Sequence, residues 1–73
     1  MYLVKKQSKA IKNKWIPHPN QSLVDVLGLC VNAKYFKMPE NEADVATQMI
    51  IVDHLLGEGN FIQVGDYLIY AKV

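Results

Sequence analysis

The chain has 73 residues, of which 51% are hydrophobic and 21% charged, a composition typical of one small globular domain. Its single cysteine argues against a disulfide framework or a cysteine-based zinc site, and no apolar run approaches the ~20 residues that span a membrane. The net charge of +1 hides an asymmetry, because residues 1–24 carry five lysines and no acid whereas residues 25–73 carry three lysines and seven acids.

The first twenty residues contain one predicted strand and a basic segment that can be read in two ways. Tyr2–Val4 has the side chains of a β-strand. Ser8–Trp15 is compatible with a second short strand, or with a basic arm, within residues 1–20, that is partly mobile. Two prolines in Ile16–Gln21 remove backbone donors and favour extended geometry, so this segment is predicted to be a connector.

Ser22 begins the first predicted helix, because its hydroxyl can accept a free backbone amide and Asp25 follows in the first turn. Gly28 lies inside this helix at a cost of ~1 kcal/mol relative to alanine, and a glycine at such a position often permits another backbone to approach closely. Asn32 is expected to end the helix in the left-handed conformation. One helix face is apolar and is expected to be central to the core; it consists of Leu23, Val26, Leu27 and Cys30.

A second helix is predicted for residues 41–56. Lys34–Met38 precedes it as a short strand or extended link that stops at Pro39. Asn41 can cap the helix and Gly57 is expected at its C′ position. The β-branched run Ile50–Val52 would also suit a buried strand, but the helix is favoured. The residues on its apolar stripe are Val45, Met49, Val52 and Leu56.

The C-terminal segment carries the clearest local signal. Gly65-Asp66 separates two β-rich runs, Phe61–Val64 and Tyr67–Tyr70, as in a two-residue hairpin. The predicted fold is a small single α+β domain over residues 1–73, with two helices and an antiparallel sheet ending in a C-terminal β-hairpin. The oligomeric state stays open, although a terminal strand could extend the sheet across a dimer.

No motif for catalysis, metal binding or cofactor binding stands out, so we expect a protein that is not an enzyme and has no cofactor. Cys30 on an apolar helix face is better read as a small buried hydrophobe than as a nucleophile. Two further groups are also set aside: the first lacks the spacing of metal ligands, and the second has a simpler explanation, because acids at a helix start are favoured by the helix dipole. They are the set His18, Asp53, His54 and Asp66, and the acidic cluster Glu40, Glu42 and Asp44.

The lysines near the N-terminus are the one feature with functional content. They can dock on an acidic protein surface, bind nucleic acid without sequence preference, or form a solvated basic face. Because the chain has no arginine, specific base readout is disfavoured. The candidate partner-binding residues are Lys5, Lys6, Lys9, Lys12, Lys14 and Trp15.

Three stretches carry a resemblance that covers roughly half of the chain. Lys5-Lys6 followed by Ala10-Ile11 and Trp15, the helix Leu23-Val-Asp-Val-Leu-Gly, and Val64-Gly-Asp-Tyr-Leu-Ile resemble small phage-encoded proteins. That group tends to have a strand where we predict the helix of residues 41–56.

In length and character the chain is similar to small phage proteins that take over host machinery. These include inhibitors of bacterial RNA polymerase of the kind known from a Xanthomonas bacteriophage; the similarity is one of size and type and assigns no residue a role. It implies a cytoplasmic protein of the host bacterial cell that binds and inhibits a host protein, RNA polymerase being the specific expectation. The alternative is a non-specific nucleic-acid-binding or nuclease-blocking module.

Overall fold

A computed structural model describes all 73 residues and contains two helices and four strands. In chain order they are β1 (Tyr2–Gln7), β2 (Trp15–Gln21), α1 (Leu23–Asn32), α2 (Glu42–Gly57), β3 (Ile62–Val64) and β4 (Tyr67–Lys72). The strands form one antiparallel sheet in the order β2-β1-β4-β3. The predicted α+β domain with a C-terminal β-hairpin is therefore confirmed.

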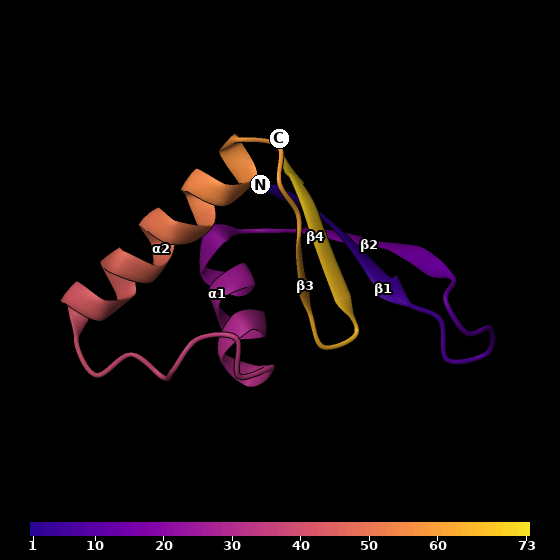
Figure 1. The fold of residues 1–73 in the computed structure, drawn as a ribbon, viewed down its shortest axis with the longest axis horizontal. Helices are drawn as coiled ribbons and strands as arrows, with labels where there is room; N and C mark the ends of the chain where they lie inside the picture. Colours follow the sequence, from indigo (N-terminus) through magenta and orange to yellow (C-terminus); the bar gives the residue numbers. More distant parts are fainter.

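The helices cover only one face of the sheet. Both lie on the same side of the strands, at the left in Figure 1, and no element covers the opposite face. The β1–β2 hairpin continues past the helices at the right of the same view, and the molecule measures 39 × 22 × 17 Å. One end of the molecule is thus a two-layer domain and the other end is a projecting hairpin.

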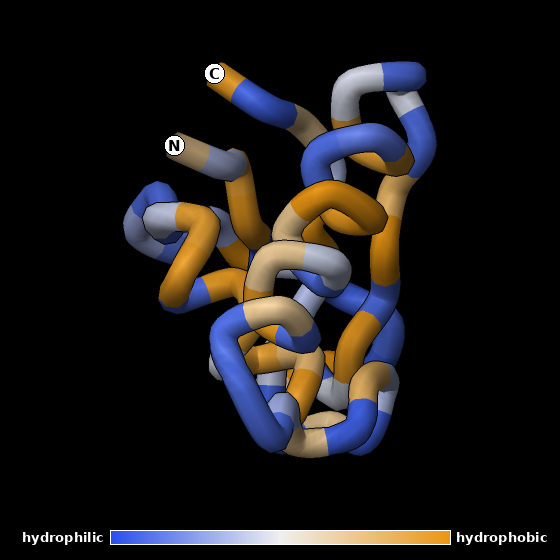
Figure 2. The backbone as a smooth tube through the Cα atoms, turned by 90° about the vertical axis from the view of Figure 1, so that its left-hand side faces the viewer, coloured by the Kyte–Doolittle hydropathy of each residue, from blue (hydrophilic) through white to orange (hydrophobic).

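The core lies between the helices and the sheet, and every buried residue is hydrophobic. Ile69 is fully buried in β4, while its neighbours Leu68 and Tyr70 are only half-buried on the other face, as the alternation of a strand requires. In Figure 2 hydrophilic residues occur in the connections and also along β1 and β2. The core consists of Tyr2, Val4, Val26, Leu27, Cys30, Val52, Leu56, Ile62, Val64 and Ile69.

Both helices begin where the sequence predicts. The Ser22 hydroxyl accepts a hydrogen bond from the Asp25 amide at 3.2 Å, and the Asn41 side chain accepts one from the Asp44 amide at 2.9 Å. The favoured helix over residues 41–56 is confirmed as α2, so the strand that the resemblance implies for this segment is not present.

After each helix, the residue in the left-handed conformation lies two positions later than the sequence predicts. Asn32 remains inside α1 and Lys34 adopts the left-handed conformation, with φ 60°. Gly57 likewise remains inside α2, and Gly59 adopts it, with φ 84°. In each case the helix continues until it meets a residue that can adopt the left-handed conformation. The backbone amides there still donate to the last carbonyls of the helix.

The expected strand at Lys34–Met38 is wrong, and the extended link is a turn followed by irregular chain. The amides of Tyr35 and Phe36 donate to the Cys30 carbonyl at 2.8 and 3.3 Å, which ties the segment to the end of α1. The amides that a strand would offer to a neighbour are therefore already used.

The second strand also lies elsewhere than predicted. Ile16–Gln21, predicted to be a connector, belongs to β2, and most of Ser8–Trp15 forms the loop before it. Pro17 and Pro19 are tolerated because β2 is an edge strand, where an amide can face away from the sheet. Extended geometry at the prolines then favours the strand rather than opposing it.

The C-terminal hairpin turns at Gly65-Asp66 as predicted, with Gly65 at φ 57° and Val64 paired with Tyr67. However, β4 lies between β1 and β3 and is not an edge of the sheet. The suggested extension of the sheet through this strand across a dimer is therefore wrong.

Candidate functional site

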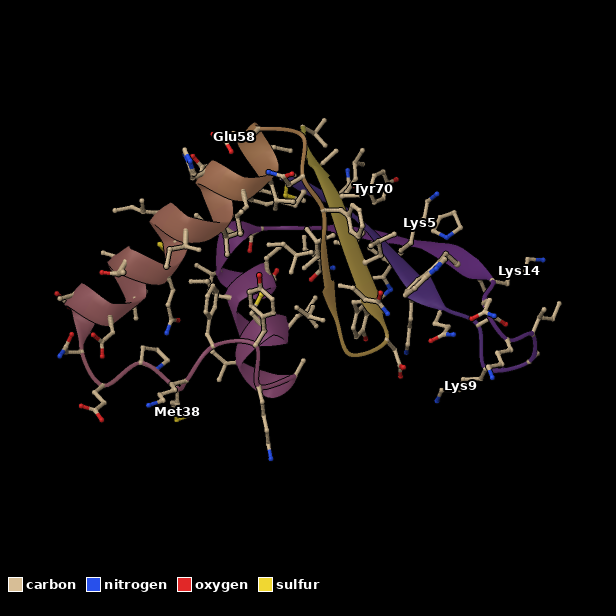
Figure 3. The ribbon with its side chains drawn as sticks, viewed as in Figure 1. Lys5, Lys9, Lys14, Met38, Glu58 and Tyr70 are labelled. Carbon is tan, nitrogen blue, oxygen red and sulfur yellow. The ribbon has the colours of Figure 1, made fainter.

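The six predicted partner-binding residues all lie on the β1–β2 hairpin. We call this set the lysine hairpin; it consists of Lys5 and Lys6 in β1, Lys9, Lys12 and Lys14 in the loop, and Trp15 at the start of β2. Figure 3 shows Lys9 and Lys14 at the end of the molecule farthest from the helices. The structure thus places the loop lysines at a projecting end, whereas Lys5 and Lys6 lie in the sheet beside β4.

The loop at the tip is shaped by local hydrogen bonds. The Ser8 hydroxyl accepts from the amides of Ala10 and Ile11, both at 3.2 Å, and Asn13 adopts the left-handed conformation with φ 65°. The Ser8 amide closes the loop on the Lys14 carbonyl at 2.7 Å. The loop lysines and the apolar Ile11 are consequently exposed together at the tip.

Lys5 and Lys6 point to opposite faces of the sheet because they are neighbours in a strand. The Lys5 Nζ lies 5.1 Å from the centre of the Tyr70 ring, and the Lys6 Nζ lies 5.5 Å from the centre of the Tyr67 ring. His18 packs edge-on against the same Tyr67 ring at 5.2 Å. Each strand lysine therefore has a cation–π contact, and the lysine hairpin is basic on both sides and at the tip.

The uncovered face of the sheet carries an aromatic and aliphatic surface beside Lys5. Trp15 is half-buried and pairs with Gln7, two residues from Lys5 and so on the same face. Leu68 pairs with Lys5 and also faces that side, as does Tyr70. We call Lys5, Trp15, Leu68 and Tyr70 the open face. The alternation in Tyr67–Tyr70 was the sequence signal for Leu68 and Tyr70, but only the sheet order places them beside Lys5.

The charges of the lysine hairpin are not neutralised within the chain. The two ion pairs in the structure join Lys72 to Asp53 at 2.6 Å and His54 to Glu58 at 3.1 Å, and neither involves a hairpin lysine. The acids lie mainly in the helical layer, and the helix-start cluster is exposed or half-buried. An acidic partner would therefore not have to displace a carboxylate of this chain.

A polar cluster fastens α2 to the sheet. The carboxylate of Asp53 accepts hydrogen bonds from the Tyr2 hydroxyl at 3.0 Å and the Lys72 ammonium at 2.6 Å. These bonds lower the pKa of Asp53, and the bond to Asp53 raises the pKa of Lys72. Burial, followed by the bond to Asp53, raises the pKa of Tyr2. Every group is held in its ordinary charge state, which suits a structural tie rather than acid–base chemistry.

The other candidate groups stay apart or buried. Cys30 is fully buried, as expected, and burial raises the pKa of its thiol to about 11. No three His, Cys, Asp or Glu side chains come together as metal ligands, and no helix has the length and apolar character to cross a membrane. Comparison with protein-family models, with curated proteins and with solved structures found no match.

Proposed function

We propose that this protein is a non-enzymatic regulator of phage type that binds and inhibits a host protein through its lysine hairpin. The observation that carries the proposal is the projecting hairpin itself, whose five lysines have no carboxylate partner in the chain. The first candidate partner is bacterial RNA polymerase, in the cytoplasm of the host cell, because of the resemblance in size and character to phage inhibitors of that enzyme.

The physical mechanism has two stages. The unpaired lysines steer the protein toward an acidic surface and raise the association rate. Apolar side chains next to them, Ile11 at the tip and Trp15 at the base of the loop, then slow dissociation by burying area against the partner. A bound domain of this size acts by excluding a competing factor, such as a sigma factor, from the surface that it covers.

The test is a binding and transcription assay with purified bacterial RNA polymerase. We expect the protein to bind the polymerase at low salt and to reduce single-round transcription. The double variant Lys9→Glu/Lys12→Glu should slow association at least about tenfold, because both lysines are exposed at the tip. Lys34→Glu/Lys37→Glu changes the net charge equally at exposed sites outside the hairpin and should have little effect.

Two results would contradict the proposal. If a low-salt pull-down from bacterial lysate recovers no polymerase subunit, RNA polymerase is not the partner. If the two double variants behave alike in every binding assay, the lysine hairpin is not the docking surface.

The open face favours a second candidate function, non-specific binding of single-stranded nucleic acid. Tyr70 and Trp15 can stack on bases while Lys5 contacts phosphate, and this chemistry needs no arginine. Such binding is strongest at low salt, so gel shifts with a single-stranded oligonucleotide at about 50 mM salt decide the question. Tyr70→Ala should weaken binding, whereas Tyr35→Ala, on the connector after α1, should not.

A further inference from the structure

The helical layer has an apolar hollow on its outer side that the lysine hairpin does not touch. We call it the helix groove; it encloses about 320 Å³ between α1, the connector and α2. Val24 and Met38, on its wall, are 65% and 77% exposed, so two large hydrophobic side chains are available there to a partner. The groove is lined mainly by Val24, Leu27, Gly28, Met38, Val45 and Met49.

Gly28 in this groove has no explanation inside the chain. It is exposed in the middle of α1, its φ is not positive, and apart from its chain neighbours and the backbone of its own helix no atom lies within 4 Å of a Cβ built on it. The close approach that this glycine permits is therefore not made within the molecule. Alanine would stabilise the helix by up to ~1 kcal/mol, so the glycine costs stability and leaves the groove floor open.

A polar atom beside the groove also lacks a partner. The side-chain amide of Gln48 donates to the Lys37 carbonyl at 2.9 Å, while its Oε1 is buried without a hydrogen bond. Gln48 lines both the helix groove and the adjoining hollow. Because this atom has almost no exposed surface, a donor of an occupant can reach it only if the Gln48 side chain turns.

The charge around the groove selects the occupant. The hollow next to it contains Glu40 and Asp44 against one lysine, Lys37. Glu42 follows in the first turn of α2, and Asp25 lies one turn before Gly28 on α1. An apolar groove beside a hollow with two carboxylates and one lysine matches a helix that has aliphatic side chains on one face and lysine or arginine beside them.

We propose that the helix groove binds a cationic amphipathic helix of a partner protein, with Gly28 providing the close approach. This surface is separate from the lysine hairpin and its proposed function does not depend on that of the hairpin. An aliphatic side chain of the partner enters beside Gly28, and its cationic side chains face Glu40 and Asp44 in the adjoining hollow.

The test uses a labelled 14-residue peptide of leucine and lysine that forms an amphipathic helix, with a leucine–glutamate peptide as the charge-inverted probe. The full chain should bind the lysine peptide, and the Gly28 amide should shift in the NMR spectrum. Gly28→Leu fills the groove and should weaken binding at least tenfold. The matched variant Gly57→Leu places the same side chain on an equally open helical glycine outside the groove and should bind normally.

Each alternative outcome overturns the proposal. These outcomes are no binding of the lysine peptide, equal binding of both peptides, or equal affinities of the two leucine variants. Self-association of the wild type that Gly28→Leu abolishes would mean that a second copy occupies the groove. Circular dichroism confirms that the variants are folded, and Lys9→Glu/Lys12→Glu should leave the peptide affinity within about threefold, which separates this test from that of the hairpin.

Discussion

The buried thiol of Cys30 predicts a specific loss of stability at alkaline pH. Cys30 is fully buried against the core, and burial raises the pKa of its thiol from the ordinary 9.0 to about 11. The native state therefore keeps this proton at a pH where the unfolded chain has lost it. The contribution of the thiol to stability is complete below pH 9 and disappears as the pH rises through 11.

The magnitude follows from the size of the pKa shift. A difference of one pKa unit corresponds to 1.36 kcal/mol, so raising the pKa from 9.0 to about 11 corresponds to about 2.7 kcal/mol. About half of it, roughly 1.4 kcal/mol, is lost by a pH of about 10. That is a large part of the stability of a small domain.

The assay compares urea unfolding of the wild type and Cys30→Ala across the alkaline range. The pKa values of Tyr2 and Lys72 are also raised, so their contributions to the free energy of unfolding fall in the same pH range in both proteins. The difference between the two curves therefore isolates the effect of the thiol. The wild type should lose about 1.4 kcal/mol more than the variant between pH values of about 7 and 10. Parallel curves would refute the reasoning, because they would mean that Cys30 titrates alike in the folded and unfolded states.

Three further predictions concern the helices. Gly28→Ala should raise the free energy of unfolding by up to ~1 kcal/mol in chemical denaturation, because the exposed site has room for the methyl group; a decrease would contradict this. Asn41→Ala should lower it by about 1 kcal/mol through loss of the cap on α2, and an unchanged value would show that the cap is idle. The lowered pKa of Asp53 means that its contribution is present above the unfolded pKa near 4 and is lost as pH falls through the folded value. Asp53→Asn should therefore show a shallower fall in stability in acid, and an equal slope would exclude this role.

The parts of the fold that sequence predicts are those fixed by neighbouring residues. The side chains of Ser22 and Asn41 cap their helices by accepting hydrogen bonds from amides three residues ahead. A short stretch of sequence is therefore enough to predict where each helix begins. The Gly65-Asp66 turn joins two strands that pair directly, and it too was predicted. The helix ends were less accurate because Lys34 and Gly59 compete with nearer candidates for the left-handed conformation.

The parts that sequence missed depend on distant partners. Ile16–Gln21 looks like a connector until β1 lies beside it, since the prolines fit only because this strand is at the edge. The lysine hairpin was identified as a set of residues, but its division between two faces depends on Tyr67 and Tyr70 from the other end of the chain. The helix groove forms where α1, the connector and α2 come together. In the sequence, the glycine at position 28 inside a predicted helix was its one signal.

The separation of charge along the molecule supports treating the two proposed docking surfaces as independent. The molecule is 39 Å long, whereas the screening length at physiological ionic strength is about 8 Å, so the basic tip and the acidic helical layer hardly influence one another. Head-to-tail association of two copies would bring these opposite charges together. However, the tip offers Ile11 as its exposed large apolar side chain and is a loop, so it does not match a groove suited to an amphipathic helix. Self-assembly through these two surfaces is therefore disfavoured, and we expect salt to weaken binding at both proposed surfaces.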